Sequence, residues 1–229
     1  GPVLALLNND LVLRDGWIEP MLRALRRLGS RAGLVGNIQY DAAMERVDHT
    51  GIFINLKGKP EHLRQMPSFV SLLRPVRPVT AVTGACVLVN RATWLRLGGF
   101  DETYVNGCED VDLCLRAREA GLVNSIALRS CVLHHVSTSP GRKQHDEENT
   151  RRLVLRWRRE VALLGSRDWT IDYFRRVIRD PRDFPDPMEA WRMVFYMGHL
   201  REAPPKTSLA GMDLATQAEL ARWRNLSSD

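Results

Sequence analysis

Short apolar runs recur along the first part of the chain and are separated by amphipathic stretches. The continuous apolar runs at 3–7 and 32–37 are typical of strands that are buried on both faces in a parallel sheet. The run at 79–90 is the strongest strand pattern in the chain, and 125–136 has strand character again. We therefore predict strands at these positions.

Segments with helical periodicity lie between and after these runs. In the first of them, the apolar residues fall on one helical stripe that ends at Gly29: Ile18, Met21, Leu22, Leu25 and Leu28. The stretches 91–99 and 111–121 predict two further helices that end at glycines. A helix over 147–165 would pack through its apolar residues: Leu153, Leu155, Trp157, Val161 and Leu164. This alternation predicts an α/β sheet with helices on its faces.

The remaining segments indicate how the chain is divided. The stretch 51–62 has the pattern of a hairpin, and several prolines around it mark a long loop within 38–77. Beyond about residue 165 the sequence becomes rich in proline and charge, and the apolar segment 190–200 is short. We therefore predict a core over 1–165 and a C-terminal helical extension over 166–229.

Composition narrows the classes of protein to consider. A hydrophobic content of 44% over 229 residues suffices for a globular domain with a core and a modest appendage. The net charge of +6 favours phosphate-bearing or anionic partners, although a solvated cationic face produces the same charge. Because the arginines are spread along helices and no module of stacking aromatic residues is visible, we expect no nucleic-acid partner.

Apolar stretches and cysteines bear on location. No uninterrupted apolar stretch approaches the roughly 20 residues that span a bilayer, so we expect at most peripheral membrane contact. Cys86, Cys108, Cys114 and Cys131 form neither a CxxC pair nor a regular framework, so we interpret them as reduced residues, mostly in the core. The expected location is cytoplasmic, at most peripheral to the inner face of the cell membrane.

Three polar motifs follow apolar elements, where sheet proteins present ligands: NND at 8–10, CED at 108–110 and HH at 134–135. One carboxylate and one histidine can hold a divalent cation when a diphosphate supplies the remaining ligands, and Asp10 with one of the histidines fits this need. The alternative is that NND caps the following helix or forms an Asx turn, and that the histidines are structural.

The adjacent acids Glu109 and Asp110 form a more specific pattern. Two carboxylates at the start of a helix interact favourably with its dipole. Their like charges can raise the pKa of one of them toward a value that suits a general base. Asp112 adds a third acid in the same turn. Helix capping explains one of these acids, but a cluster of this size is more than a cap requires.

Three segments occur in an order that resembles a known enzyme family: LLNNDLVLRDGWIEPML (6–22), VTGACVLVNRATWLRLGGFDETYVNGCEDVDLCLRAREAG (82–121) and VLHHVSTS (132–139). Over 3–157 the chain resembles the family-2 inverting glycosyltransferases of the GT-A fold, in particular the bacterial rhamnosyltransferase-like branch. The resemblance implies a partial GT-A fold: a Rossmann-like sheet of the nucleotide-diphospho-sugar transferase kind, flanking helices and a C-terminal helical extension.

The resemblance also implies a metal site. NND is similar to the DxD motif of the family, in which Asp10 would bind Mn²⁺ or Mg²⁺ and, with Asn9, contact the donor diphosphate. Asn8 stands where many relatives have aspartate. In the pattern that joins a histidine to Ser139, His134 takes the histidine position and would complete the metal shell. The histidine favours manganese over magnesium.

The same resemblance implies roles for the other motifs. Asp110 would deprotonate the acceptor hydroxyl, and Glu109 would position the acceptor or the base. Gly84 and Ala85 fall on a strand of small residues that lets the substrate approach closely. Arg142 would lie over the diphosphate, although an exposed loop charge is the more frequent meaning of such a residue.

The implied activity is the transfer of a sugar from a nucleotide-sugar donor to a saccharide or lipid-linked acceptor in bacterial polysaccharide biosynthesis, with inversion in one displacement step. In this family, the βα units before the DxD strand hold the nucleotide, and this chain starts on that strand. We therefore expect these units to be absent, with a homo-oligomer through the truncated sheet edge or weak donor binding as the consequence. The alternative is a catalytically inactive glycosyltransferase-like fragment that acts as an interaction module.

Overall fold

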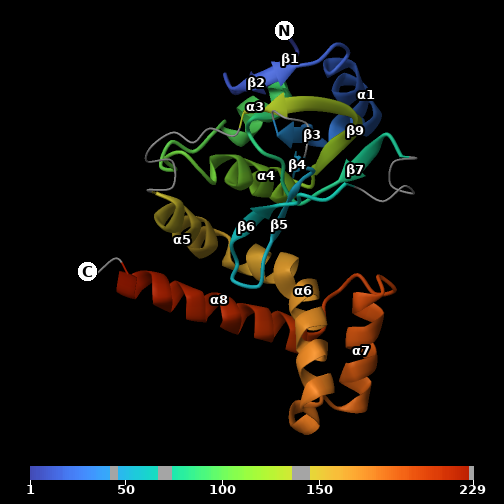
Figure 1. Ribbon diagram of the computed structural model, residues 1–229, viewed down its shortest axis with the longest axis vertical. Coiled ribbons are helices and arrows are strands. Elements are labelled where there is room, and N and C mark those ends of the chain that lie inside the picture. Colours follow the sequence, from blue (N-terminus) through green and yellow to red (C-terminus); the bar gives the residue numbers. More distant parts are fainter. Residues whose placement is uncertain (42–45, 67–73, 136–144, 227–229) are drawn as a thin grey trace. The chain divides into compact units, whose positions relative to one another are not determined.

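The computed structural model of the chain describes residues 1–41, 46–66, 74–135 and 145–226. It divides into two compact units (Figure 1). The sheet unit comprises Gly1–Phe53 and Pro60–Asn149, and the helical unit comprises Ile54–Lys59 and Thr150–Asp229. Residue 165, after which we predicted a boundary, lies inside the long helix Arg158–Arg179 of the helical unit.

The sheet unit is built on a mixed sheet in the order β1-β8-β3-β9-β2, with β4 added to β3 and β7 added to β9. β3 and β9 run parallel, whereas the other pairs are antiparallel. The strands are β1 (Val3–Leu7), β2 (Leu11–Leu13), β3 (Ala32–Asp41), β4 (Val47–His49), β7 (Val76–Pro78), β8 (Cys86–Asn90) and β9 (Val123–His134). This arrangement confirms the predicted α/β sheet.

The first strand is confirmed, but its predicted setting is wrong. β1 pairs antiparallel with β8, from Val3 opposite Asn90 to Leu7 opposite Cys86, and it lies at one end of the strand order. It is not buried on both faces, since Leu7 is 42% exposed. A short apolar run does not by itself distinguish a central parallel strand from an end strand with one apolar face.

The apolar run 79–90 forms a strand only in its second half, as β8, so the predicted length is wrong. In the first half, side chains take the backbone donors that a neighbouring strand would use. The Thr83 N–H donates to His49 Nε2, and the Gly84 N–H donates to the Asp110 carboxylate. The apolar pattern indicated burial correctly, but it could not show that the hydrogen-bond partners are side chains.

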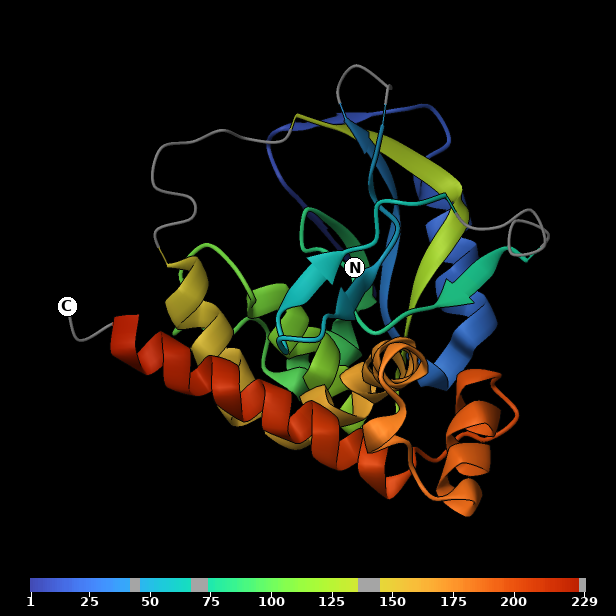
Figure 2. The same cartoon turned by 60° about the horizontal axis from the view of Figure 1, so that its bottom comes forward.

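Helices cover both faces of the sheet. The elements are α1 (Ile18–Leu28), the short 3-10 helix η1 (Gly29–Arg31), α3 (Arg91–Leu97) and α4 (Glu109–Glu119). α1 lies alongside β9 in both Figure 1 and Figure 2 and buries Met21 and Leu25, as its stripe predicted. Cys86 and Leu88 of β8 face α1. Val87 and Val89 alternate with them along the strand and are also fully buried. α4 contacts β3 and β9.

The predicted hairpin is present as β5 (Ile52–Ile54) and β6 (Pro60–His62). The helices that follow are α5 (Asp146–Arg156), α6 (Arg158–Arg179), η2 (Pro181–Asp183), α7 (Pro187–Met197) and α8 (Lys206–Leu226). They confirm C-terminal helices. Within the described ranges, none of the helices combines the length and the apolar character needed to cross a membrane.

The single helix predicted over 147–165 is wrong, because α5 and α6 are separated at Trp157, whose φ of -110° and ψ of 23° leave the helical region. Helical hydrogen bonds nevertheless continue across the break, because the Trp157 N–H donates to Leu153 O and the Val161 N–H donates to Trp157 O. The apolar residues therefore keep their helical spacing on both sides of Trp157. Leu153 and Val161 are buried as predicted. Leu155, predicted to pack, is 53% exposed.

Candidate functional site

The NND motif forms the turn between β1 and β2. The Asn8 N–H donates to Ala85 O at 2.8 Å, and the His135 N–H donates to Asp10 O at 2.9 Å. The side chains of Asn8 and Asn9 are exposed, whereas Asp10 is half-buried. Backbone hydrogen bonds therefore hold this turn against two of the segments that the sequence singled out, 84–85 and 134–135.

The structure brings Asp10 and His134 together. β2 pairs with β9 so that Leu11 lies opposite His134, and the Asp10 Oδ1 atom is 3.4 Å from His134 Nε2. Both atoms are buried, and neither has a hydrogen-bond partner among the residues that the structure describes. His134 Nδ1 instead lies 3.3 Å from Asp48 Oδ2, in hydrogen-bond geometry. His134 is thus held between two carboxylates on opposite edges of its ring.

This arrangement fits a divalent cation. A neutral imidazole has one N–H, and a proton on Nδ1 toward Asp48 leaves a lone pair on Nε2 facing the Asp10 oxygen. Two buried lone pairs that face each other are unfavourable unless a cation or a proton lies between them. Among the described residues, no group of three or more His, Cys, Asp or Glu side chains could hold a metal, so a cation at Asp10 and His134 would need ligands from outside the described part of the chain. Such cations commonly take further ligands from phosphates and water.

Asp48 was missed by the sequence analysis. It lies in β4, within the segment 38–77 that showed a mixed pattern, and neither motif nor periodicity marks it. The hydrogen bond from His134 is the main cause that holds the pKa of the Asp48 carboxyl below its ordinary value, and burial opposes this effect. Asp48 is therefore the ionised partner of His134.

Asp110 is the second residue of α4. Its Oδ2 accepts the Gly84 N–H at 2.7 Å, and its Oδ1 accepts the Val111 N–H at 2.7 Å. Burial raises the pKa of Asp110, and the hydrogen bonds from these backbone N–H groups oppose part of the increase. A carboxyl whose pKa is raised toward neutrality is a better proton acceptor than an ordinary exposed aspartate.

The backbone before α4 is strained. Asn106 has a φ of 56° and Cys108, the residue that caps α4, has a φ of 72°, both in the left-handed region. A non-glycine residue other than asparagine or aspartate in this region costs on the order of 1 kcal/mol or more. Strain of this kind tends to persist where a loop must present a particular side chain. Here the strained residues immediately precede Glu109 and Asp110, the first two residues of α4.

The small residues 84 and 85 act through their backbone. The Gly84 N–H binds Asp110, and Ala85 O accepts the Asn8 N–H. Ala85 itself is buried. A Cβ on Gly84 would meet the Asp110 Cβ at 3.4 Å, an ordinary contact, so the protein itself does not require glycine here. The segment 83–85 therefore connects the NND turn to the start of α4.

The three acids at the start of α4 have different surroundings. Glu109 is the first residue of the helix and is half-buried. Asp112 is fully buried and accepts a hydrogen bond from Arg116 Nε at 2.8 Å. The same guanidinium donates to Leu97 O and Gly99 O, so Asp112 and Arg116 fasten the end of α3 to α4. Asp112 is thus a structural acid.

His49 is a second residue that the sequence analysis did not identify. It is fully buried, and burial lowers its pKa well below the ordinary value, so its ring is neutral. Its Nε2 accepts the Thr83 N–H at 3.4 Å, and its ring contacts that of His62 edge-on at 4.8 Å. β4 therefore supports both sides of the site, through Asp48 and through His49.

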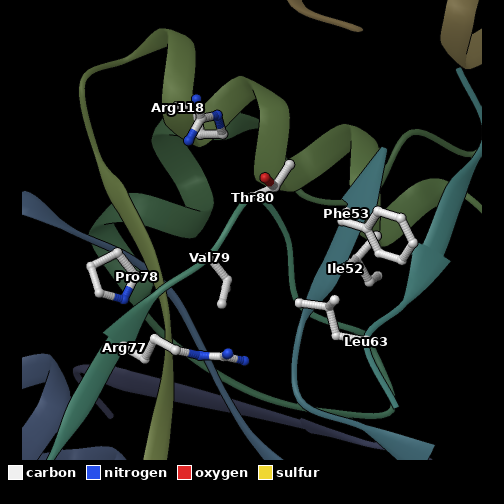
Figure 3. A pocket seen from close by; sticks show the side chains of 8 residues that line it. All are labelled: Ile52, Phe53, Leu63, Arg77, Pro78, Val79, Thr80 and Arg118. Atoms are coloured by element: carbon white, nitrogen blue, oxygen red, sulfur yellow. The ribbon is translucent and has the colours of Figure 1, made fainter. Parts of the chain in front are cut away.

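Some predicted features lie elsewhere. Arg142, and Ser139 of the histidine pattern, fall within 136–144, outside the described residues. A pocket of about 370 Å³ lies in the sheet unit, and Figure 3 shows Arg77 extending from β7 and Arg118 on α4. Its lining includes none of the predicted site residues: Ile52, Phe53, Leu63, Arg77, Pro78, Val79, Thr80 and Arg118.

Comparison with known proteins gives partial matches. No protein-family model matches the chain. The chain is 30% identical over 181 residues to the uncharacterized protein y4gI of Sinorhizobium fredii, a match that covers 76% of this chain and 19% of that protein. Over 66 residues it is 44% identical to the N-acetylglucosaminyl-diphospho-decaprenol L-rhamnosyltransferase of Mycobacterium tuberculosis, covering 29% of this chain and 22% of the enzyme.

A third relative is the O-antigen biosynthesis protein RfbC of Myxococcus xanthus, which is 29% identical over 147 residues, or 61% of this chain and 11% of that protein. The chain thus spans between 11% and 22% of the length of these curated relatives. A crystal structure of GalNAc-T7 with UDP, GalNAc and Mn²⁺ matches with a TM-score of 0.52 and 15% identity, covering 92% of this chain and 40% of that one. The chain has a GT-A-like glycosyltransferase fold, with distant partial similarity to rhamnosyltransferase and O-antigen biosynthesis proteins.

Proposed function

We propose that this chain carries the acceptor-side, catalytic part of a metal-dependent inverting glycosyltransferase that moves a sugar from a nucleotide-sugar donor to a saccharide or lipid-linked acceptor. The observation that carries the proposal is the buried pair formed by Asp10 Oδ1 and His134 Nε2, 3.4 Å apart and without hydrogen-bond partners among the described residues. The similarity to a rhamnosyltransferase and to an O-antigen biosynthesis protein supports the same class of reaction.

Asp10 and His134 would hold Mn²⁺ or Mg²⁺. The combination of a carboxylate and an imidazole favours Mn²⁺, and the GalNAc-T7 structure of similar fold contains this ion together with UDP. Bound there, the cation would supply positive charge to the donor diphosphate and stabilise it as the leaving group. Asn9, exposed in the same turn, and Arg142 are proposed to contact the diphosphate.

Asp110 would act as the general base. Its carboxylate takes the proton of the acceptor hydroxyl while the acceptor oxygen attacks the anomeric carbon and the bond to the diphosphate breaks. The Gly84 N–H keeps one carboxylate oxygen in place, and the raised pKa increases its affinity for the proton. Glu109, next to it in α4, is proposed to position the acceptor or the base. One displacement inverts the anomeric centre without a covalent intermediate.

The second candidate is an interaction module without activity. It is favoured by exposed apolar side chains on α7, where Met188 is 62% exposed and Trp191 is 61% exposed. Such side chains often mark a surface that another molecule covers. The measurement described next separates the two candidates, because an interaction module has no need of a metal at Asp10.

The test is calorimetric titration of the chain with Mn²⁺ in the presence of a panel of nucleoside diphosphates. We expect metal-dependent nucleotide binding that Asp10→Asn weakens by more than about 100-fold, because a direct ligand matters more than the groups that support it. Asp15→Asn is the matched control, since it removes the same charge from an exposed position. Equal binding by the wild type and Asp10→Asn, or no binding by either, would contradict the proposal and favour the interaction module.

A further inference from the structure

Asp48 occupies an irregular position in the sheet. β4 pairs antiparallel with β3, where His49 lies opposite Gln39 and Val47 lies opposite Tyr40. The register shifts between these two pairs, which leaves Asp48 as an extra residue on the β4 side. A β-bulge of this kind re-aims a side chain and is common beside active sites. Here the bulge directs the Asp48 carboxylate to His134 at the end of β9.

The Asp48 side chain is held from more than one direction. Its Oδ2 lies 3.3 Å from His134 Nδ1, and its Oδ1 lies 3.8 Å from Arg64 Nε. Only 12% of the Asp48 side chain is exposed, and only 3% of the His134 side chain. Neither group can therefore turn freely away from the other.

The ring geometry determines what Asp48 can do. Nδ1 and Nε2 lie on opposite edges of an imidazole, so Asp48 and Asp10 cannot approach the same nitrogen in this arrangement. A carboxylate that accepts the Nδ1–H keeps the proton on that nitrogen and leaves the Nε2 lone pair available to a cation. The Nε2 lone pair then faces Asp10 Oδ1, which is the second proposed metal ligand.

We propose that Asp48 is a positioning residue that fixes His134 in the tautomer with hydrogen on Nδ1 and so presents Nε2 to a divalent cation beside Asp10. This inference rests on the proposed function, because it assigns Asp48 to the support of the same metal site. Asp48 itself contacts neither the cation nor the substrate. A neutral imidazole carries its hydrogen on either Nδ1 or Nε2, and only the Nδ1–H tautomer leaves Nε2 able to bind a metal. Asp48 favours that tautomer.

The first measurement requires no substitution. In metal-free protein labelled with ¹⁵N-histidine, we expect His134 to show a protonated Nδ1 and an unprotonated Nε2, with its signals assigned through His134→Gln. A hydrogen on Nε2 in the metal-free protein would overturn the inference. This readout does not depend on activity or on the folding of an Asp48 variant.

The second measurement compares Asp48→Asn with Asp15→Asn, which has the same chemical change at an exposed position. An asparagine amide can donate to Nδ1 as well as accept from it, so we expect a mixture of tautomers and Mn²⁺ binding that is about 10–100-fold weaker. Asp15→Asn should bind Mn²⁺ like the wild type. The thermal unfolding temperature of each variant shows whether it remains folded.

The outcomes separate this inference from the proposed function. If Asp10→Asn loses Mn²⁺ binding but Asp48→Asn binds like the wild type with the same tautomer, the metal site stands and the role of Asp48 is refuted. If the wild-type chain binds no Mn²⁺ with any nucleoside diphosphate, both are refuted. Loss of binding in Asp48→Asn together with a changed His134 tautomer supports both.

Discussion

The sheet unit and the helical unit differ in whether their buried polar side-chain atoms have hydrogen-bond partners. In the sheet unit, buried side-chain nitrogens or oxygens of Asp10, His49, His62 and His134 have no hydrogen-bond partner among the described residues. In the described part of the helical unit, every buried side-chain nitrogen or oxygen has one. There, Thr170 Oγ1 lies within hydrogen-bonding distance of Ser166 O, at 2.6 Å, and of Ser208 Oγ, at 2.7 Å.

Buried polar atoms without partners indicate where a ligand can bind. A buried polar atom without a partner costs free energy, so a folded protein tends to retain one where a ligand or a proton completes it. Within its described residues the helical unit shows no such atom, and it packs closely, since a Cβ on Gly165 would lie 2.5 Å from the Met212 side chain. We therefore expect substitutions at the site of the sheet unit to change activity more than stability, and substitutions in the helical unit to do the reverse.

The largest expected effect concerns Asp110. Asp110→Asn should lower kcat for glycosyl transfer by about 10²–10⁴-fold, the usual contribution of a general base, with little change in KM for the donor. The measurement is steady-state kinetics with a metal and a nucleotide-sugar donor. A variant that keeps more than a tenth of the wild-type kcat would contradict the assignment of Asp110 as the general base.

The stability of Asp110→Asn provides the control for that prediction. Burial raises the pKa of Asp110 in the folded protein above its unfolded value of about 3.9. The protonated carboxyl therefore contributes stability that is fully present below about pH 3.9. This stabilisation is lost as pH rises through the folded pKa. At pH 7, urea unfolding should therefore show Asp110→Asn to be at least as stable as the wild type.

Asp112 lies in the same helix as Asp110, but we expect its substitution to change stability. Its buried ion pair with Arg116 is structural, so Asp112→Asn should lower the free energy of unfolding by about 3 kcal/mol, because it leaves the guanidinium without its counter-charge. The matched control is Asp172→Asn in α6, which removes the acid of an exposed i,i+4 pair with Arg176 and should cost less than about 0.5 kcal/mol. Urea unfolding measures both. A stable Asp112→Asn without transferase activity would place this acid in the site instead.

The smallest effect is expected in the helical unit. A Cβ on Gly211 would lie 2.0 Å from Trp169, so Gly211→Ala should lower the free energy of unfolding by about 1–2 kcal/mol, after the gain in helix propensity offsets part of the overlap. Gly198→Ala is the control, because its Cβ would meet nothing closer than 3.5 Å. Metal binding by Gly211→Ala should equal that of the wild type. Weaker metal binding in this variant would show that the two units are not independent.

Much of the local structure was predictable because it depends on neighbours along the chain. The stripe that includes Met21 and Leu25 identified α1, and the glycine at residue 98 identified the end of α3. Asp10, Asp110 and His134 were identified from motifs. The structure places Asp10 beside His134, and Asp110 on the Gly84 N–H.

Other features could not be predicted because they depend on residues far apart in the sequence. The apolar run that ends in β8 gave no sign that Thr83 and Gly84 bond to side chains. The acids of α4 look alike in sequence, yet Arg116 makes Asp112 structural. Asp48 has no motif at all, and its importance follows from a bulge in β4 and from its distance to His134.

By itself, the sequence determined the α/β character of the first part of the chain, the amphipathic face of α1, and the residue types that could hold a cation and accept a proton. These properties follow from the spacing of apolar residues and from the chemistry of single side chains. Only the tertiary structure decided that His134 lies between Asp10 and Asp48, and that Asp110 and Asp112 have different roles. The physical reason is that partners and burial set the protonation state of a polar group, and both arise from segments that meet only when the chain folds.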